Sequence, residues 1–363
     1  MKVDYSEKIF QENIQIYNSL LDEESKALYR ANMIWRIMGE AEFYKSVAEL
    51  DAGRDFGWNE LMDYEYFNNP DHRGIILFGS GTQGLEFYYQ LVTLGYRLLG
   101  FCDNNKGRVG TNYLGLEVLS VEQVLQDYQD AFIVVTPCKY GQKIFQQLVS
   151  LGFNKDNICV PMTGFACIYN VMREQYFDKN IMKPSDNEVF IDAGAYDGNT
   201  VLDFVEWSGG KYKEIYAMEP SPEIMLKCKT NLERNEVCNV HYIQAGCFSS
   251  STTLKFDNSM NTSGAATIST AGEMEIDVVS IDEMLDGKEA TFIKMDIEGV
   301  ELEALKGAKE TIRMYKPKLA ICIYHKKEDA FTIPNYIKSL RDDYQFYIRK
   351  YTPHHGEMVL YAI

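Results

Sequence analysis

One short stretch of the chain combines two glycines with two acidic side chains. "FIDAGAYDGNT" places Asp192 before Gly194, and Asp197 directly before Gly198. A phosphate-binding turn offers bare backbone amides, often with a lysine, because phosphate is an anion. The acidic side chains would repel phosphate and attract a cation. The turn therefore indicates a ligand with an ammonium or sulfonium group; S-adenosylmethionine has both and carries no phosphate.

The ends of the next apolar runs fit the same ligand. Glu219 ends "EIYAMEP", where a carboxylate can bind both ribose hydroxyls, and "VHYIQAG" ends where the adenine edge would lie. Ligands of open α/β sheets bind at the carboxyl ends of the strands. The residues expected around this cofactor are Asp192, Gly194, Ala195, Tyr196, Asp197, Gly198, Thr200, Glu219, Ser221, Gln244, Ala245, Cys247 and Asp296.

Two further runs carry candidate catalytic residues. "TFIKMDIEGVE" places Lys294 and Asp296 on one strand face, with Glu298 just beyond, and "ICIYHKKED" places His325 after the following strand. A sugar hydroxyl is a poor nucleophile at neutral pH, so its methylation needs a base or a metal ion. We predict that His325 takes the proton while Asp296 and Glu298 orient the acceptor and balance the charge of the cofactor.

Two alternatives stay open for this group. Lys294 either belongs to the catalytic set or forms a buried structural ion pair with a neighbouring acid. Asp296 and Glu298 could hold Mg²⁺, since hard oxygen ligands suit that ion. We favour the version without a metal, and no metal ligands are assigned. The lone histidine also has an ordinary structural interpretation.

A second glycine turn lies upstream. "GSGTQG" places Gly79, Gly81 and Gly84 in the spacing G-x-G-x-x-G, and Asp103 follows 19 residues beyond Gly84. This matches the dinucleotide fingerprint, in which the acid binds ribose hydroxyls. The stretch "GFCDNNKGRVGTNYLGLEVLS" also resembles the amino-terminal domains of sugar-tailoring enzymes such as nucleotide-sugar acetyltransferases. The resemblance implies either a bound nucleotide or nucleotide-sugar, or a vacant scaffold; hydride transfer has no accompanying catalytic group.

The elements that must position these residues fall into four segments. Residues 1–70 have helical periodicity, with Leu28, Ala31, Trp35 and Met38 on one face, and predict a helical cap that could support self-association. Residues 71–165 alternate short strands with helices and predict a small Rossmann-like domain with a parallel sheet.

Residues 166–187 predict a helical connector, and residues 188–363 a second alternation with seven strands. Its last two strands are joined by "TPHHGE", whose His354 and His355 look like solvated turn residues, and form an antiparallel hairpin. The polar insertion that follows the third strand predicts a small hairpin or a lid over the substrate.

The second half of the chain resembles the FkbM family of S-adenosylmethionine-dependent methyltransferases. The stretches that carry the resemblance are "IDAGAYDGNT", "EPSPE", "VVSIDEML", "FIKMDIEGVELEALKGA" and "RKYTP…GEMVLYAI". It implies a seven-stranded α/β sheet in the order 3-2-1-4-5-7-6, with Asp192, Gly194, Glu219 and Asp296 at cofactor-facing positions. It also implies O-methylation of a sugar, polyketide or other hydroxylated metabolite.

Composition limits the remaining classes. The net charge of -17 argues against nucleic-acid binding, which needs clustered Lys and Arg. No apolar run approaches a membrane span, and the polar amino terminus argues against a signal peptide. The eight cysteines include no C-x-x-C pair, which favours a reducing cytoplasm.

We therefore expect a cytoplasmic S-adenosylmethionine-dependent O-methyltransferase that acts on a small-molecule or glycan hydroxyl. One rival is a regulatory protein that binds S-adenosylmethionine or a nucleotide-sugar without turnover. The other is an NAD-dependent sugar-tailoring enzyme that acts through the turn at 79–84.

Overall fold

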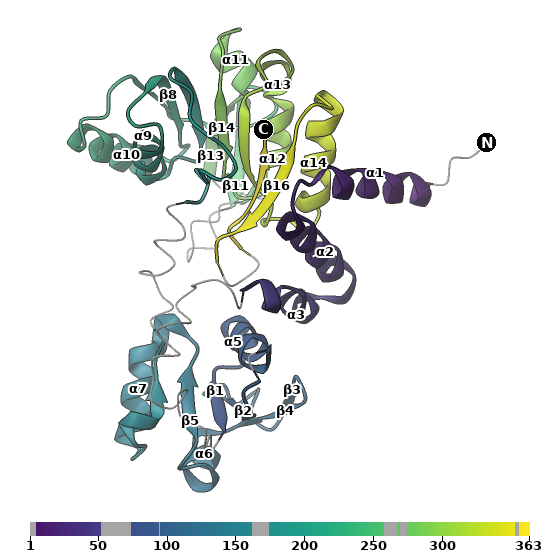
Figure 1. Cartoon of the computed structure of the whole chain (residues 1–363). Helices are drawn as coiled ribbons and strands as arrows, with labels where there is room; N and C mark the ends of the chain where they lie inside the picture. Colours follow the sequence, from purple (N-terminus) through teal and green to yellow (C-terminus); the bar gives the residue numbers. More distant parts are fainter. Residues whose placement is uncertain are drawn as a thin grey trace. The chain divides into compact units, whose positions relative to one another are not determined.

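The computed structural model describes residues 5–51, 74–93, 95–161, 174–257, 267–268, 274–352 and 356–363 (Figure 1). Two compact units share the chain: the first holds Met1–Tyr29, Arg173–Lys350 and Gly356–Ile363, and the second holds Arg30–Met172 and Tyr351–His355. The expected helical segment 1–70 is thus divided between the units, within one helix. His354, His355, and parts of the connector and of the polar insertion lie outside the described residues.

A seven-stranded sheet forms the centre of the first unit, with the order β16-β17-β15-β14-β7-β8-β9. Counted along the chain, this order is 3-2-1-4-5-7-6. Strand β17 runs antiparallel to β15 and β16, and the other neighbours are parallel. Its strands are β7 (Glu188–Ala193), β8 (Tyr212–Met218), β9 (Val240–Ile243), β14 (Phe292–Met295), β15 (Lys318–Cys322), β16 (Phe346–Lys350) and β17 (Met358–Ala362). The mixed α/β fold expected from the sequence is confirmed.

The central strands β7 and β14 are buried along their whole length, as expected for parallel strands covered on both faces. Phe190 stacks on Phe204, with ring centroids 4.2 Å apart, and Phe177 packs edge-on against Phe190 and Phe292. The helices of this unit are α1 (Tyr5–Ser19), α9 (Asn199–Trp207), α10 (Pro222–Arg234), α11 (Ile281–Leu285), α12 (Glu301–Lys306), α13 (Lys309–Tyr315) and α14 (Asp329–Leu340).

The start of the chain covers the edge strand β16. Leu20 forms a parallel bridge with Phe346, and the Ser25 hydroxyl accepts a hydrogen bond from the Ile348 amide at 2.9 Å. Arg349 pairs with Asp22 at 2.7 Å. Because an uncovered edge strand invites pairing with other chains, these contacts protect the sheet.

The polar insertion forms part of a four-stranded sheet with the order β10-β13-β11-β12. Its strands are β10 (Gly246–Cys247), β11 (Thr252–Asp257), β12 (Thr267–Ile268) and β13 (Met274–Val279). Strand β11 pairs antiparallel with β13, as the prediction of a small hairpin requires.

The second unit is built on a six-stranded sheet, β3-β4-β2-β1-β5-β6, which is parallel except for the β3–β4 pair. Its strands are β1 (Ile75–Phe78), β2 (Leu98–Cys102), β3 (Asn112–Tyr113), β4 (Leu116–Leu119), β5 (Phe132–Val135) and β6 (Ile158–Cys159). Its helices are α3 (Glu40–Asp51), α5 (Thr82–Thr93), α6 (Val121–Asp127) and α7 (Gly141–Ser150), with 3₁₀ turns at Cys138–Tyr140 and Lys155–Asn157, while α2 (Glu23–Met38) begins in the first unit.

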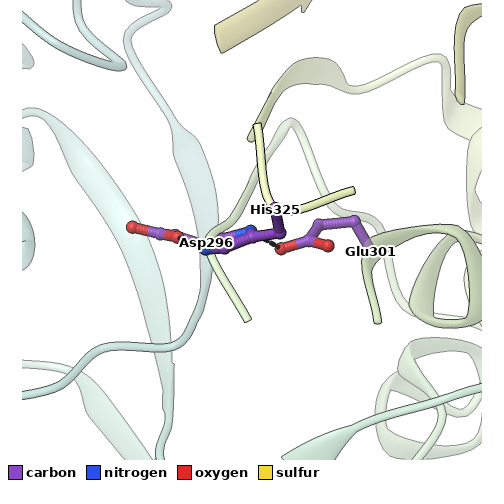
Figure 2. A group of neighbouring side chains, drawn as sticks. All are labelled: Asp296, Glu301 and His325. Carbon is purple, nitrogen blue, oxygen red and sulfur yellow. Dashed lines mark ion pairs between the residues drawn. The ribbon is translucent and has the colours of Figure 1, made fainter. Parts of the chain in front are cut away.

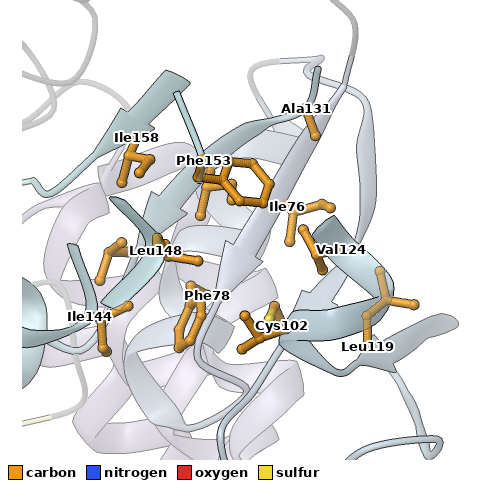
Figure 3. Close-up of a cluster of buried hydrophobic side chains, with 13 residues drawn as sticks. Ile76, Phe78, Cys102, Leu119, Val124, Ala131, Ile144, Leu148, Phe153 and Ile158 are labelled. Carbon is orange, nitrogen blue, oxygen red and sulfur yellow. The ribbon is translucent and has the colours of Figure 1, made fainter. Parts of the chain in front are cut away.

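Strand β1 shows how this second sheet is held. Ile75 and Leu77 pack in one apolar cluster, with Phe87 of α5. Ile76 and Phe78 point to the opposite face and join Val124, Ile144 and Leu148 of α6 and α7 (Figure 3). Alternate side chains of a strand thus face two separate cores, as the period of two requires. Among the described residues, no helix is long and apolar enough to cross a membrane.

Candidate active site

The turn after β7 requires its glycines. Gly194 has a φ of +83°, and a Cβ atom there would clash with the carbonyl oxygen of Asp296. Gly198, with a φ of +85°, is the residue from which α9 starts. Only glycine combines that backbone conformation with such a close approach of two chain segments. The turn and the end of β14 are therefore held against each other at the carboxyl edge of the sheet.

A buried ion pair lies beneath this turn. Lys294 Nζ lies 2.9 Å from Asp192 Oδ1 and donates a hydrogen bond to the Gly194 carbonyl at 2.8 Å. The Lys294 ammonium also lies 5.2 Å from the centre of the Tyr176 ring. Burial disfavours the charged lysine, but Asp192 and Asp296 outweigh it and raise the pKa of Lys294. Asp192 thus has a buried partner in Lys294, which is the ion pair that one of the two alternatives for Lys294 predicts.

The other predicted cofactor residues differ in exposure. Glu219 is almost fully buried, its Oε1 accepts a hydrogen bond from the Ser221 amide at 2.9 Å, and burial raises its pKa. Asp197 binds the amide of the neighbouring Asn199 at 3.2 Å. Tyr196 is 59% exposed. Ser221 caps helix α10, so the Glu219 turn is fixed by local hydrogen bonds.

The predicted cofactor residues that follow β9 differ in how exposed they are. Gln244 is exposed, whereas the Cys247 side chain is buried in the four-stranded sheet, where burial raises its thiol pKa to about 12. Ala245 lies between them, and its amide donates to the Ile243 carbonyl at 2.8 Å. Thr200 is half-buried at the start of α9.

Four ionisable side chains meet where β14 and β15 end. His325 Nε2 lies 3.5 Å from Asp296 Oδ1 and 3.5 Å from Glu298 Oε2. On the other side of the ring, His325 Nδ1 lies 2.9 Å from Glu301 Oε1 (Figure 2). Burial disfavours the imidazolium, but the three carboxylates outweigh burial and raise the pKa of His325 to about 9. The sequence predicts that His325 acts together with Asp296 and Glu298, and the structure brings these three side chains together. The sequence does not predict the contact with Glu301.

A set of hydrogen bonds around Asp296 was also missed. The Tyr176 hydroxyl donates to Asp296 Oδ2 at 2.9 Å, and the Tyr324 hydroxyl donates to Asp296 Oδ1 at 3.2 Å. Glu357, which precedes β17, accepts from the Tyr324 hydroxyl at 3.5 Å and from Gln175 Nε2 at 2.7 Å. Tyr324 could have been found from its place beside His325. Tyr176 carries no such signal in the sequence.

Comparison with known proteins identifies this arrangement. A family profile described as "Methyltransferase FkbM domain" matches residues 192–359. This range includes the glycine turn, Glu219 and the group formed by Asp296, Glu298, Glu301 and His325, which we call the acidic centre. Residues 192–359 form a methyltransferase FkbM domain. The first unit of the chain therefore carries a methyltransferase domain, as the resemblance in the sequence implied.

Two similar proteins place the FkbM domain in context. The hexuronic acid methyltransferase AglP of Haloferax volcanii is 34% identical over 99 residues, which are 26% of this chain and 40% of that protein. The crystal structure of the methyltransferase FkbM from Methylobacillus flagellatus KT is 21% identical, with a TM-score of 0.50 over 88% of this chain and 98% of that chain. That second likeness concerns the fold alone.

The FkbM domain also contains donors that could face a cation. Asp296, Glu301 and His325 each offer one ligand atom, and these atoms lie within 4.8 Å of one another. However, Glu301 Oε1 also accepts hydrogen bonds from the amides of Ile297 at 3.0 Å and Gly299 at 3.3 Å. This oxygen is therefore engaged by two backbone amides and also lies beside the imidazole.

The glycine turn of the second unit is also built around an acid. Asp103 accepts hydrogen bonds from the Ser80 amide at 2.9 Å, the Ser80 hydroxyl at 2.6 Å and the Asn105 amide at 2.8 Å. The predicted ribose-binding carboxylate therefore holds the turn itself. Gly79 has a φ of +113°, and a Cβ atom on Gly84 would clash with the Gly79 carbonyl oxygen.

Two cavities open beside this turn. One has a volume of about 480 Å³ and is lined in part by Asp103, Arg108 and Lys143. The other, of about 300 Å³, is lined in part by Gly81 and again by Arg108. Arg108 donates a hydrogen bond to the Ser80 carbonyl oxygen, which directs its guanidinium across the turn. Three of the predicted site residues, Gly79, Gly81 and Asp103, thus line the larger cavity together with the cationic side chains of Arg108 and Lys143, whereas Gly84 lines neither cavity.

Proposed function

We propose that the FkbM domain is an S-adenosylmethionine-dependent O-methyltransferase that acts on a hydroxyl of a sugar, glycan or related metabolite. The proposal rests on one juxtaposition: the glycine turn, Glu219 and the His325 centre follow strands β7, β8, β14 and β15, which are neighbours in the sheet. Ligands of such sheets bind at this edge. The likeness to a hexuronic acid methyltransferase supports a sugar as acceptor.

The residues that would hold the cofactor divide into two roles. The backbone of the turn at Gly194 and Gly198 would contact the amino-acid part, and Glu219 would accept hydrogen bonds from the ribose hydroxyls. The cofactor supplies a methyl group on a sulfonium, for transfer by in-line displacement. The Asp192–Lys294 pair, being buried, would act through the turn and not through contact with the ligand.

The proton from the acceptor hydroxyl would pass to His325 Nε2. A pKa of about 9 means that His325 carries a proton at neutral pH, so its capacity as a base rises as the pH approaches that value. Asp296 is held by Tyr176 and Tyr324 and would orient the acceptor. Glu298, whose side chain is 40% exposed, is open enough to contact the acceptor directly.

A transfer assay tests this function. Incubation with methyl-labelled S-adenosylmethionine and a panel of neutral sugars, uronic acids and nucleotide-sugars should give labelled product, and His325→Ala should lower the rate roughly a hundredfold. An unchanged rate in His325→Ala would exclude the histidine as base. Loss of activity with EDTA and recovery with Mg²⁺ would overturn the metal-free version. Cofactor binding without transfer to any acceptor would favour the regulatory rival.

We propose further that the cavities of the second unit bind a nucleotide or nucleotide-sugar through its phosphates. Arg108 and Lys143 supply cationic partners, and phosphate oxygens bind guanidinium groups in paired hydrogen bonds. Since Asp103 already binds the turn, this proposal does not assign it to a ribose. Calorimetric titration with UDP, UDP-sugars, NAD and NADP tests it. Binding that Arg108→Ala weakens about tenfold supports the proposal, whereas absence of heat with every ligand contradicts it.

A further inference from the structure

Glu301 is an unexpected residue in the FkbM domain. It occupies the first turn of α12 and is fully buried, with 0% of its surface exposed. Burial of a carboxylate is strongly unfavourable unless a charge partner and hydrogen bonds compensate for the lost water. Among the described residues, its ion-pair partner is His325.

The contacts of Glu301 connect two parts of the acidic centre. Its Oε1 accepts hydrogen bonds from the Ile297 and Gly299 amides at 3.0 and 3.3 Å, and lies 2.9 Å from His325 Nδ1. The two amides flank Glu298, which has a φ of +57°. A left-handed backbone at a residue other than glycine is unfavourable and persists only when its surroundings fix it. One carboxylate oxygen therefore fixes both the Glu298 turn and the His325 ring.

We propose that Glu301 is a positioning residue for the proposed methyl transfer: it keeps the proton of His325 on Nδ1 and directs Nε2 toward the acceptor between Asp296 and Glu298. The inference rests on the proposed function. In the step, the acceptor oxygen forms the new O–C bond as the S–C bond breaks, and the bonding electrons leave with sulfur. The acceptor proton moves to Nε2. Glu301 stays ionised and stabilises the imidazolium that results.

This role follows the logic by which a base is itself oriented by a third group. Glu301 has no access to the acceptor, because it is buried behind the His325 ring (Figure 2). The charged and titratable groups that face His325 are Asp296 and Glu298 from the turn after β14, Glu301 from α12, Glu357 before β17 and the neighbouring Tyr324. Burial, and after it the charge of Glu301, raises the pKa of Asp329 in α14. Of these, Glu301 alone is paired with Nδ1.

The substitution Glu301→Gln keeps the shape of the side chain and removes its charge. Glu303→Gln is the matched control, because Glu303 lies on the same helix and pairs with Lys306 on the surface. We expect E301Q to lower the transfer rate at its pH plateau by roughly tenfold to a hundredfold. It should also shift the apparent pKa of the rate downward by about one to two pH units. Affinity for S-adenosylmethionine should stay unchanged, and E303Q should match the wild-type protein throughout.

An E301Q protein whose rate falls while its apparent pKa stays at the wild-type value would overturn the proposal, because a structural defect alone gives that result. A second measurement needs no turnover and no variant at Glu301. The five histidines can be labelled with ¹⁵N and titrated by NMR, with His325→Gln identifying the His325 signal. We expect His325 to titrate well above its ordinary value with the proton on Nδ1 in its neutral form.

A His325 that titrates near pH 6.5, or whose neutral form carries its proton on Nε2, would overturn the proposal even if E301Q fails to fold. The two readouts separate this inference from the proposed function. If no acceptor is methylated but His325 behaves as expected in the titration, the assignment of the reaction fails and the pairing of Glu301 with His325 stands.

Discussion

The two glycine turns of the molecule use the same backbone device with opposite charges. Both follow the first strand of a sheet whose central strands are parallel, and both contain a glycine whose Cβ atom would clash with a carbonyl oxygen, at Gly194 and at Gly84. Beneath the Gly194 turn lies a buried cation, Lys294, and carboxylates line the edge beyond it. In the second unit the carboxylate of Asp103 holds the turn, and Arg108 lines the cavity.

We infer from this difference that a close approach to a glycine turn does not by itself determine which ligand is bound. The spacing fixes how closely a ligand can approach the backbone, whereas the charge that stays accessible selects its sign. The two ligands proposed above follow this rule: a cationic ligand at the turn of the FkbM domain and an anionic one in the second unit. An acidic residue near a glycine turn therefore predicts the charge of the ligand only if its carboxylate stays accessible and is not already hydrogen-bonded to the turn.

The sharpest test of the comparison removes the buried cation. Lys294→Met leaves the Asp192 carboxylate buried without a partner, and loss of one member of a buried pair destabilises a protein by about 3–5 kcal/mol. Arg108→Met removes a partly exposed cation in the second unit and should change stability far less. Chemical unfolding followed by circular dichroism measures both.

The double variant Asp192→Leu/Lys294→Met is the control for this prediction. If the buried charge is the cause, the double variant should be more stable than Lys294→Met alone. A Lys294→Met protein as stable as the Arg108→Met protein would show that the two turns do not differ in the way described.

A smaller effect is expected from adding a methyl group to each turn. Gly194→Ala places a Cβ atom against the Asp296 carbonyl oxygen at a positive φ, which should destabilise the FkbM domain by about 2–4 kcal/mol. Gly81→Ala is the matched change, because the nearest atom to its Cβ would be Arg108 Nη1 at 3.8 Å, an ordinary contact. Equal melting temperatures for the two variants would contradict the close approach at Gly194.

The sequence predicted the parts of this site that local chemistry requires. The glycine turn, Glu219 and the meeting of Asp296 with His325 follow from apolar runs that end in polar residues at one edge of a parallel sheet. The pairing of Lys294 with Asp192 depends on their being register partners on neighbouring strands. Periodicity gives the face of a strand and not its register, so that pair stayed an alternative.

Burial was the main quantity that the sequence did not provide. Glu301 and Glu303 stand two residues apart in the same helix, yet one is fully buried and the other lies in a surface ion pair. Tyr176 reaches Asp296 across 120 residues of chain, from a segment expected to be a connector. Tertiary packing decides both cases, and no local pattern distinguishes them.

The smallest expected difference between the two turns is in how the unfolding free energy depends on pH. The cation of the acidic centre is a histidine, a side chain that changes its charge near neutral pH, whereas the cation that lines both cavities of the second unit is an arginine. Since the folded-state pKa of His325 is raised to about 9, its ion pairs stabilise the protein fully below about pH 6.5. This contribution is lost as the pH rises through 9.

The difference in unfolding free energy between wild-type protein and His325→Gln should therefore be larger at pH 6 than at pH 9.5, by about 1–3 kcal/mol. Arg108→Gln should show the same difference from wild type at both pH values. A pH-independent effect of His325→Gln would mean that folding does not shift the pKa of His325 and that the three carboxylates do not stabilise the imidazolium.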